Sequence, residues 1–216
     1  MVEQTPRERA ETALRGDRPV TIPFTVYESM PPSAPVLDEY KRRGLVIVHR
    51  FSVVDFEHPN CTVQNTRYRE EGRELVRTDI GTPEGDLHRI VEPAGFTTWT
   101  HKYLFSDKDD YPALSFYLRD MIAVPRYDRA EKLAAESDEN TILRTTFGLE
   151  PMQHLISGGV FGTEHFCIEW MENRDEVLKL YEIMVAKRRS VYPLVAESPV
   201  LHANYGGNVV PEIVGL

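Results

Sequence analysis

The runs LVIV at residues 45–48 and VTIPFTVY at residues 20–27 decide the fold class of this chain. Both are too short for a helix and are rich in β-branched residues, so each predicts a buried strand, although Pro23 weakens the hydrogen bonding of the second. Two more core strands are expected around residues 141–147 and 199–204. Because helical patterns separate these strands, the sequence predicts an α/β fold with a parallel sheet.

Helical patterns fill most of the segments between the predicted strands. The first helix begins at Pro6, where Thr5 and Glu8 form a capping box, and Gly16 ends it. The other predicted helices cover residues 34–43, 107–122, 127–136, 150–157, 162–172 and 175–191, and residues 209–216 have the pattern of a further helix start.

Residues 61–105 differ from the rest of the chain. They alternate between polar and apolar positions and contain turns such as Thr82-Pro83-Glu84-Gly85. This pattern predicts an inserted β-meander with a structural role beside the main fold.

Four strands are half of what an eight-stranded (β/α)8 barrel, the TIM barrel, contains, and such a barrel takes about 250 residues. We therefore expect residues 1–216 to be the N-terminal part of a single TIM-barrel domain, truncated after about four core strands. The alternative is a complete four-stranded α/β domain with a short last helix.

The composition argues against several classes of partner. The chain has a formal net charge of -9, 41% hydrophobic residues and 27% charged residues, which is the balance of an ordinary globular protein. The basic triplet at residues 187–189 is expected to end a helix, where cations interact favourably with the helix dipole, so no nucleic-acid partner is expected. No apolar run approaches the roughly 18 residues of a membrane span, and the N-terminus is charged, which predicts a cytoplasmic protein with no membrane partner.

Residues 5–9 (TPRER), 13–19 (ALRGDRP) and 22–24 (IPF) together resemble the N-terminus of the uroporphyrinogen decarboxylase superfamily. Residues 77–87 (RTDIGTPEGDL) and 105–111 (FSDKDDY) resemble its methyltransferase-like branch, which includes methylcobalamin:coenzyme M methyltransferases. The same order continues at residues 150–151, 161–164, 171–177 and 202–212, so that the resemblance covers essentially the whole chain.

The resemblance implies a TIM barrel and, for the full-length protein, a corrinoid and a zinc ion bound by a His-x-Cys pair and a distant Cys in the second half of the barrel. His165 and Cys167 have the His-x-Cys spacing, but they fall in a predicted helix, where positions i and i+2 point about 200° apart. We expect them to pack in the core. With Cys61 as the second of only two cysteines and no Cys-x-x-Cys spacing, neither a metal site nor a cofactor is predicted within this chain.

Functional groups of a TIM barrel lie at the carboxyl ends of the strands and in the loops that follow them. For proton transfer the candidates are Glu28 and His202. The candidates for substrate binding are Arg50, Glu150, His202, Asn204 and Tyr205. The alternative for each is a polar loop residue without catalytic weight, and Tyr205, which precedes two glycines, is otherwise part of a turn.

Three functions are consistent with these patterns. The first is methyl transfer between a corrinoid and a small acceptor, with a corrinoid protein as an expected partner. The second is uroporphyrinogen decarboxylation in porphyrin and heme biosynthesis. The resemblance argues against it at one point, because residues 26–32 (VYESMPP) stand where the decarboxylases carry the arginines that bind the tetrapyrrole carboxylates. The third is a non-catalytic half-barrel that binds a partner or forms a homodimer through its open sheet edges.

Overall fold

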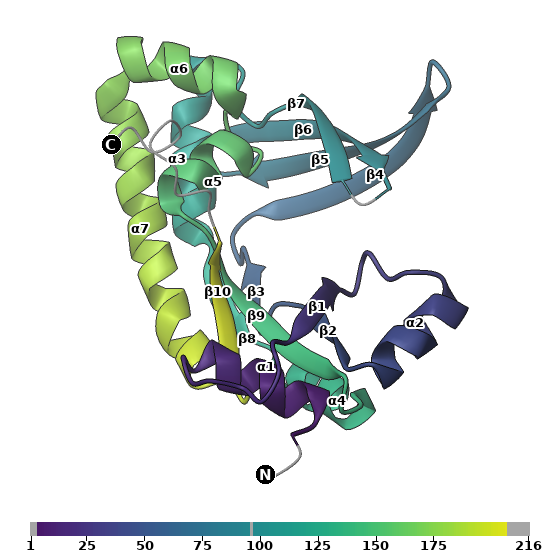
Figure 1. The fold of residues 1–216 in the computed structure, drawn as a ribbon. Coiled ribbons are helices and arrows are strands. Elements are labelled where there is room, and N and C mark those ends of the chain that lie inside the picture. The colour runs from purple at the N-terminus through teal and green to yellow at the C-terminus, as the bar shows by residue number, and fades with distance from the viewer. Residues whose placement is uncertain (1–3, 96, 207–216) are drawn as a thin grey trace. The chain divides into compact units, whose positions relative to one another are not determined.

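The computed structural model of the chain describes residues 4–95 and 97–206 (Figure 1). The chain divides into two compact units. Unit 1 comprises Met1–Val54, Pro125–Thr146 and Leu194–Asn204, and unit 2 comprises Asp55–Val124, Phe147–Pro193 and Tyr205–Leu216. The helix start predicted for residues 209–216 lies outside the described residues.

A four-stranded parallel sheet is the centre of unit 1, as the sequence predicts. Its strands lie in the order β1-β2-β9-β10, which is also their order along the chain. Its elements are α1 (Pro6–Leu14), β1 (Phe24–Tyr27), α2 (Ala34–Arg42), β2 (Leu45–Arg50), α4 (Tyr127–Glu136), β9 (Thr141–Leu149) and β10 (His202–Gly206). The boundary between the units falls within β9 and β10.

Local chemistry sets the ends of the first two elements. The predicted capping box is confirmed, because the Thr5 hydroxyl accepts a hydrogen bond from the Glu8 amide (3.2 Å) and the Glu8 carboxylate accepts one from the Thr5 amide (2.8 Å). The strand predicted over residues 20–27 is wrong in its first half. It starts only at Phe24, directly after Pro23, which has no N–H group to donate.

Alternation along the strands separates the two faces of the parallel sheet. Val46 and Val48 share one face, where they pack with Ala10 of α1 and with Ile142 of β9 in a small buried cluster. Helix α1 thus lies against this face, and the same face lines the pocket described below.

Unit 2 combines a meander with a group of helices. The predicted meander is an antiparallel sheet in the order β4-β5-β6-β7, and β3 and β8 form a separate two-stranded sheet. The elements that lie wholly or mostly in unit 2 are β3 (Val54–Glu57), β4 (Thr62–Glu70), β5 (Arg73–Thr82), β6 (Gly85–Ala94), β7 (Thr97–Lys102), a 3-10 turn (Lys108–Asp110), α3 (Tyr111–Asp120), β8 (Ile122–Pro125), α5 (Pro151–Ser157), α6 (Gly162–Glu172) and α7 (Arg174–Ala196).

The helix predicted over residues 107–122 is shorter than expected. Asp107 caps a 3-10 turn through its side chain, which accepts a hydrogen bond from the Asp109 amide (2.9 Å), and α3 begins only at Tyr111. At its other end Met121 leaves the helical conformation, with ψ at 121°, and the chain continues as the unpredicted strand β8.

An aromatic cluster forms the core of unit 2. Phe105 and Phe161 are each at most 2% exposed, and their ring centroids lie 4.8 Å apart. Tyr111 packs against both rings at 5.3 and 6.3 Å. Its hydroxyl donates a 2.7 Å hydrogen bond to the carboxylate of Glu169, a buried residue of α6, so this buried carboxylate has a hydrogen-bond partner.

Burial of His154 on α5 makes the stability of unit 2 sensitive to acid. Burial, together with the positive charges of Arg188 and Arg89, lowers the pKa of His154 to about 4 from an ordinary value of 6.5. Between these two values only the unfolded chain takes up the proton, so the free energy of unfolding should fall as the pH falls from about 6.5 to about 4. The loss in the free energy of unfolding is at most about 3 kcal/mol, and above pH 6.5 this loss is absent because His154 is then neutral in both the folded and the unfolded chain.

Urea unfolding of the wild type and of His154→Gln at about pH 7 and about pH 4.5 measures this contribution. The variant should lose less stability between the two pH values than the wild type, because glutamine takes up no proton. Equal losses in the two proteins would show that His154 is protonated alike in the folded and unfolded chains.

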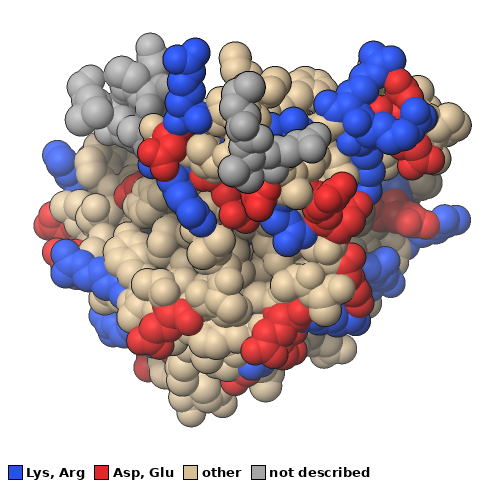
Figure 2. All heavy atoms as spheres, turned by 60° about the horizontal axis from the view of Figure 1, so that its bottom comes forward, with Lys and Arg blue, Asp and Glu red and all other residues tan. Residues whose placement is uncertain are grey.

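No helix within the described part of the chain is long and apolar enough to cross a membrane. On the face drawn in Figure 2, basic and acidic side chains are interspersed.

Candidate functional site

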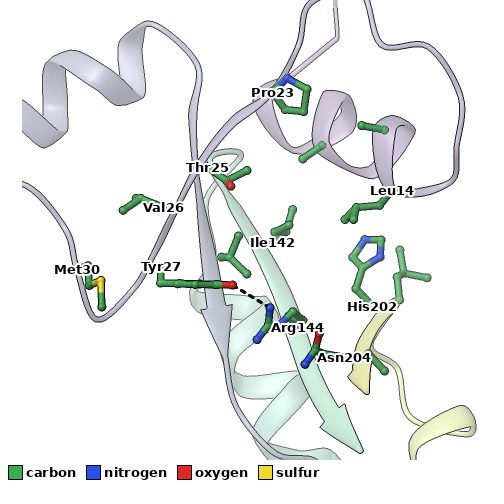
Figure 3. Close-up of a pocket in the computed structure, with 15 residues that line it drawn as sticks. Leu14, Pro23, Thr25, Val26, Tyr27, Met30, Ile142, Arg144, His202 and Asn204 are labelled. Carbon is green, nitrogen blue, oxygen red and sulfur yellow. Dashed lines mark hydrogen bonds between the residues drawn. The ribbon is translucent and has the colours of Figure 1, made fainter. Parts of the chain in front are cut away.

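A pocket of ≈ 820 Å³ opens in unit 1 over the parallel sheet (Figure 3). This volume lies in the range of small-molecule sites. The polar part of the lining comes from Thr25, Tyr27, Arg144, His202 and Asn204. The apolar wall includes Leu14, Pro23, Val26, Met30, Ile142 and Leu201. The pocket therefore combines an apolar enclosure with a few polar groups from strands β1, β9 and β10.

Arg144 is the cation of this lining, and the sequence did not single it out. It lies two positions after Ile142 on β9, so both side chains point to the pocket face of the sheet. Its Nη1 donates a hydrogen bond to the Tyr27 hydroxyl at 3.3 Å, and its guanidinium lies 5.3 Å from the centre of the Tyr27 ring (Figure 3).

The Arg144 guanidinium is incompletely satisfied. Its Nε is buried and has no hydrogen-bond partner among the residues that the structure describes. Within the same part of the chain, no ion pair involves Arg144. A buried donor without a partner costs free energy unless a ligand or water completes it, so this atom marks a binding position for a hydrogen-bond acceptor.

The structure places His202 and Asn204, both predicted site residues, in the same pocket lining. The Nε2 atom of His202 is also buried and unpartnered within the described residues. Burial lowers the pKa of His202, so the imidazole is neutral at pH 7. A neutral imidazole carries one donor and one acceptor nitrogen, and His202 therefore offers a polar contact rather than a charge.

Glu28 and Arg50, the other predicted residues of unit 1, pair with each other. The Glu28 carboxylate accepts hydrogen bonds from the Arg50 amide (3.1 Å), Nε (3.2 Å) and Nη2 (3.0 Å). Burial by itself would raise the pKa of Glu28, but the hydrogen bonds from Arg50 lower it overall, so the carboxylate stays ionised and is a weaker base than usual. The Arg50 guanidinium also stacks 4.2 Å from the centre of the Tyr27 ring.

Glu28 and Arg50 are hydrogen-bonded to each other beside Tyr27, so neither is a free acid, base or anion-binding group. The Arg50 and Glu28 side chains are 37% and 27% exposed, so solvent screens the pair and it adds little to stability. Neither residue lines the pocket. The Arg50 guanidinium lies over the Tyr27 ring, whose hydroxyl accepts the hydrogen bond from Arg144.

Glu150 and Tyr205 belong to unit 2, whereas the pocket lies in unit 1. Glu150 caps α5, because its carboxylate accepts a hydrogen bond from the Gln153 amide (3.0 Å). Burial, a hydrogen bond with Tyr192 and the negative charge of Glu150 raise the pKa of Tyr205. Glu150 therefore has a structural task at a helix start, whereas binding by Tyr205 stays a prediction.

His165 and Cys167 lie on α6, as the sequence predicts. The Nδ1 atom of His165 donates a hydrogen bond to the Phe161 carbonyl (3.2 Å), and the His165 ring packs against Phe105 with the ring centres 5.8 Å apart. The expectation of core packing is wrong for Cys167, which is exposed.

One cluster of potential metal-binding side chains was not predicted from the sequence. His58, Cys61 and Asp120 each offer a ligand atom, and these atoms all lie within 4.8 Å of one another in unit 2. Burial and the carboxyl group of Asp120 raise the pKa of the Cys61 thiol to about 11. The His-x-x-Cys spacing at residues 58–61 was visible in the sequence, but the third member comes from α3 and could not be paired with it there.

No family model matches the chain, and neither a search of curated proteins nor one of solved structures finds a match. The resemblance to the uroporphyrinogen decarboxylase superfamily therefore stays a prediction.

Proposed function

We propose that unit 1 binds a small organic anion with an apolar body, and that the chain belongs to a TIM barrel of the uroporphyrinogen decarboxylase type. The observation that carries the ligand is the buried, unpartnered Nε of Arg144 within an apolar pocket. A carboxylate satisfies such a guanidinium better than any neutral group, since charge-assisted hydrogen bonds are about twice as strong as neutral ones.

The strand order supports the barrel part of this proposal. The strands β1, β2, β9 and β10 neighbour one another in chain order, so each crossover connection advances by one strand in the same direction. A TIM barrel is built in this way, whereas a doubly wound sheet reverses its strand order at a switch point. In a TIM barrel the carboxyl ends of the strands carry the active site, and Tyr27 is the last residue of β1.

The lining also defines the shape of the ligand. Its anionic group would contact Arg144 with the Tyr27 hydroxyl beside it, and the neutral His202 would supply a further donor or acceptor. The body of the ligand would contact side chains such as Leu14 and Ile142. A carboxylic acid with an aliphatic or aromatic body meets both requirements.

Isothermal titration calorimetry with phenylacetate and its neutral analogue phenylacetamide tests this proposal. The two probes share a body and differ in the charge of the head group. We expect saturable binding of phenylacetate and at least about 10-fold weaker binding of the amide, because the guanidinium favours a charged acceptor. Equal affinities would show that the pocket does not recognise an anion, and no binding of any small carboxylate would remove the proposed function.

Methyl transfer is the reaction that the resemblance implies for such a barrel. A nucleophilic acceptor would take the methyl group from a methylated corrinoid, and the cobalt would keep the electron pair of the broken bond. The apolar pocket with Arg144 in its lining favours a small acid as acceptor. Incubation with methylcobalamin and candidate acceptors, followed by absorbance of the cobalamin, tests this reaction. Uroporphyrinogen decarboxylation, the alternative that also needs carboxylate binding, is tested by the loss of carboxyl groups from uroporphyrinogen.

An assembly role is favoured by apolar side chains on the outer edge of the parallel sheet. Ile22 is 89% exposed and Phe24, on the edge strand β1, is 65% exposed. An open sheet edge with exposed apolar residues tends to pair with another chain. We expect sedimentation equilibrium to detect a dimer that Phe24→Lys weakens, and a wild type that stays monomeric would contradict this role.

A further inference from the structure

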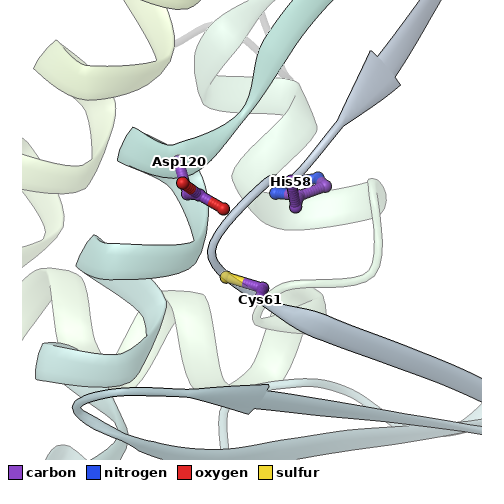
Figure 4. A group of neighbouring side chains, drawn as sticks. All are labelled: His58, Cys61 and Asp120. Carbon is purple, nitrogen blue, oxygen red and sulfur yellow. The ribbon is translucent and has the colours of Figure 1, made fainter.

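The turn between β3 and β4 brings two metal-binding side chains together in unit 2. The Cys61 amide donates a hydrogen bond to the His58 carbonyl at 3.2 Å, which closes a turn over the sequence His-Pro-Asn-Cys. Figure 4 shows His58 and Cys61 on this turn with Asp120 of α3 facing them. The arrangement unites an imidazole, a thiol and a carboxylate from two separate segments.

Asn60 fixes the carboxylate of Asp120 beside the turn. Its backbone amide donates to one carboxylate oxygen (2.8 Å), and its side-chain amide donates to the other (2.7 Å). The Cys61 thiol also hydrogen-bonds to this carboxylate, and loss of the thiol proton on metal binding frees that lone pair for the ion. Hydrogen bonds of this kind to ligating carboxylates recur in metal sites, where they orient the ligand.

The His58 ring is held in one orientation and one tautomer. Its Nδ1 lies 3.1 Å from the Tyr117 carbonyl, which can only accept a hydrogen bond, so Nδ1 carries the hydrogen and Nε2 keeps a free lone pair. The ring also stacks on the Tyr117 ring, with centres 4.0 Å apart and planes within 10°. A backbone carbonyl that binds one ring nitrogen is the common second partner of a metal-ligating histidine.

The three ligand atoms are close enough to converge on one ion. Zinc binds sulfur at about 2.3 Å and nitrogen or oxygen at about 2.0–2.2 Å, so the ligand atoms of a tetrahedral site lie about 3.5 Å apart. The ligand atoms of His58, Cys61 and Asp120 lie within 4.8 Å of one another, so they need to approach one another by only about 1 Å to bind the same zinc ion. Each of the three residues is partly buried, and the cluster therefore remains accessible to an ion.

We propose that His58, Cys61 and Asp120 bind one Zn²⁺ ion and leave its fourth coordination position open. A mixed set of nitrogen, sulfur and oxygen ligands suits zinc, whereas Mg²⁺ and Ca²⁺ take oxygen ligands only. A site with three protein ligands and one open position, which takes water or a substrate atom, is the arrangement of catalytic zinc. Binding releases the thiol proton, and the thiolate and carboxylate charges then balance the charge of the ion.

Titration of the full chain with Zn²⁺, in competition with a chromophoric chelator, and with Co²⁺ as a spectroscopic probe tests the site. The informative background is Cys167→Ser, because Cys61 is then the only thiol of the two-cysteine chain. We expect this variant to bind one zinc ion and to show a thiolate-to-cobalt charge-transfer band together with the visible bands of tetrahedral cobalt. Absence of zinc binding, or of the thiolate band, overturns the proposal without requiring any ligand variant to fold.

Ligand variants then assign the site. Cys61→Ser should lose the thiolate band, and both Cys61→Ser and Asp120→Asn should bind zinc at least about 100-fold more weakly, since changes outside the ligand shell already cost about 10–100-fold. Asn60→Ala should weaken zinc binding about 10-fold because it releases the Asp120 carboxylate. A thiolate band that persists in Cys61→Ser and disappears in Cys167→Ser would place the metal at the exposed cysteine and overturn the proposal. All of these residues belong to unit 2. A negative result for zinc binding would therefore not affect the proposal that unit 1 binds an anion.

Discussion

Replacing Arg144 by methionine is expected to weaken the binding of phenylacetate at least 30-fold. Arg144 supplies the only positive charge in the pocket lining, and its buried Nε has no other partner within the described residues. Removal of one member of a buried, hydrogen-bonded charge pair costs about 2–5 kcal/mol, and about 2 kcal/mol corresponds to 30-fold in affinity. Isothermal titration calorimetry on the variant measures this loss directly.

The fold should tolerate this substitution. Methionine has a similar length and removes a donor that the apo protein leaves unsatisfied, so the free energy of unfolding should stay the same or rise. Arg42→Met is the matched control, because the ion pair that Arg42 makes with Glu39 is exposed and Arg42 lies outside the pocket. Unchanged affinity in Arg144→Met would contradict the role of Arg144, as would an equal loss in Arg42→Met.

Replacing Phe161 by alanine is expected to lower the free energy of unfolding of unit 2 by about 3–5 kcal/mol. Phe161 is 0% exposed, and its ring packs against Phe105, Tyr111 and Phe166. Its backbone is also fixed, since its amide donates to the Leu155 carbonyl at 3.0 Å. The cavity that alanine leaves is lined by rings that cannot collapse into it without breaking these contacts, which places the cost high in the usual range.

Urea unfolding followed by tryptophan fluorescence measures this effect in unit 2 specifically, because both tryptophans, Trp99 and Trp170, belong to that unit. Met171→Ala is the control, since Met171 is 85% exposed and a comparable truncation there should change the free energy of unfolding by no more than about 0.5 kcal/mol. A loss below about 1 kcal/mol in Phe161→Ala would show that the aromatic cluster is not the core of unit 2.

The sequence predicted the elements whose signals are local. The helix at residues 127–136 and the helices near 150–157 and 162–172 are confirmed almost to the residue, and so is the meander. Their periodicity, caps and turns lie within a few residues of one another, so neighbouring positions carry the information. The parallel sheet was predictable for a related reason, because short runs with β-branched residues alternate with helices. The fourth strand, which was predicted over residues 199–204, instead spans His202–Gly206, where no residue is β-branched.

The errors arose where one residue overrides the pattern around it. Pro23 removes the amide that would extend β1 backwards, although residues 20–22 read as strand. Asp107 and Met121 shorten α3 through the backbone conformations that they adopt. The strands β3 and β8 were missed because each has only four residues and gains its stability from the other, far along the chain.

The candidate site was predictable in its place and only partly in its residues. His202 and Asn204 line the pocket, but they are the first and the middle residue of β10 rather than the end of a strand over residues 199–204, and Glu28 and Arg50 pair with each other instead of lining it. Arg144 was overlooked because an arginine within a strand reads as an interruption of an apolar run. Its value as a binding group depends on burial and on a missing partner, and neither property can be read from a linear sequence.

The most direct test of anion binding in unit 1 is the ¹H–¹⁵N NMR signal of the Arg144 Nε–H group. The signal can be assigned by its absence in Arg144→Lys, and the burial of Nε slows exchange with water. Titration with phenylacetate should shift this signal saturably, with the dissociation constant that calorimetry gives. A signal that keeps its position while phenylacetate binds would show that the acid binds elsewhere and would contradict the proposed function.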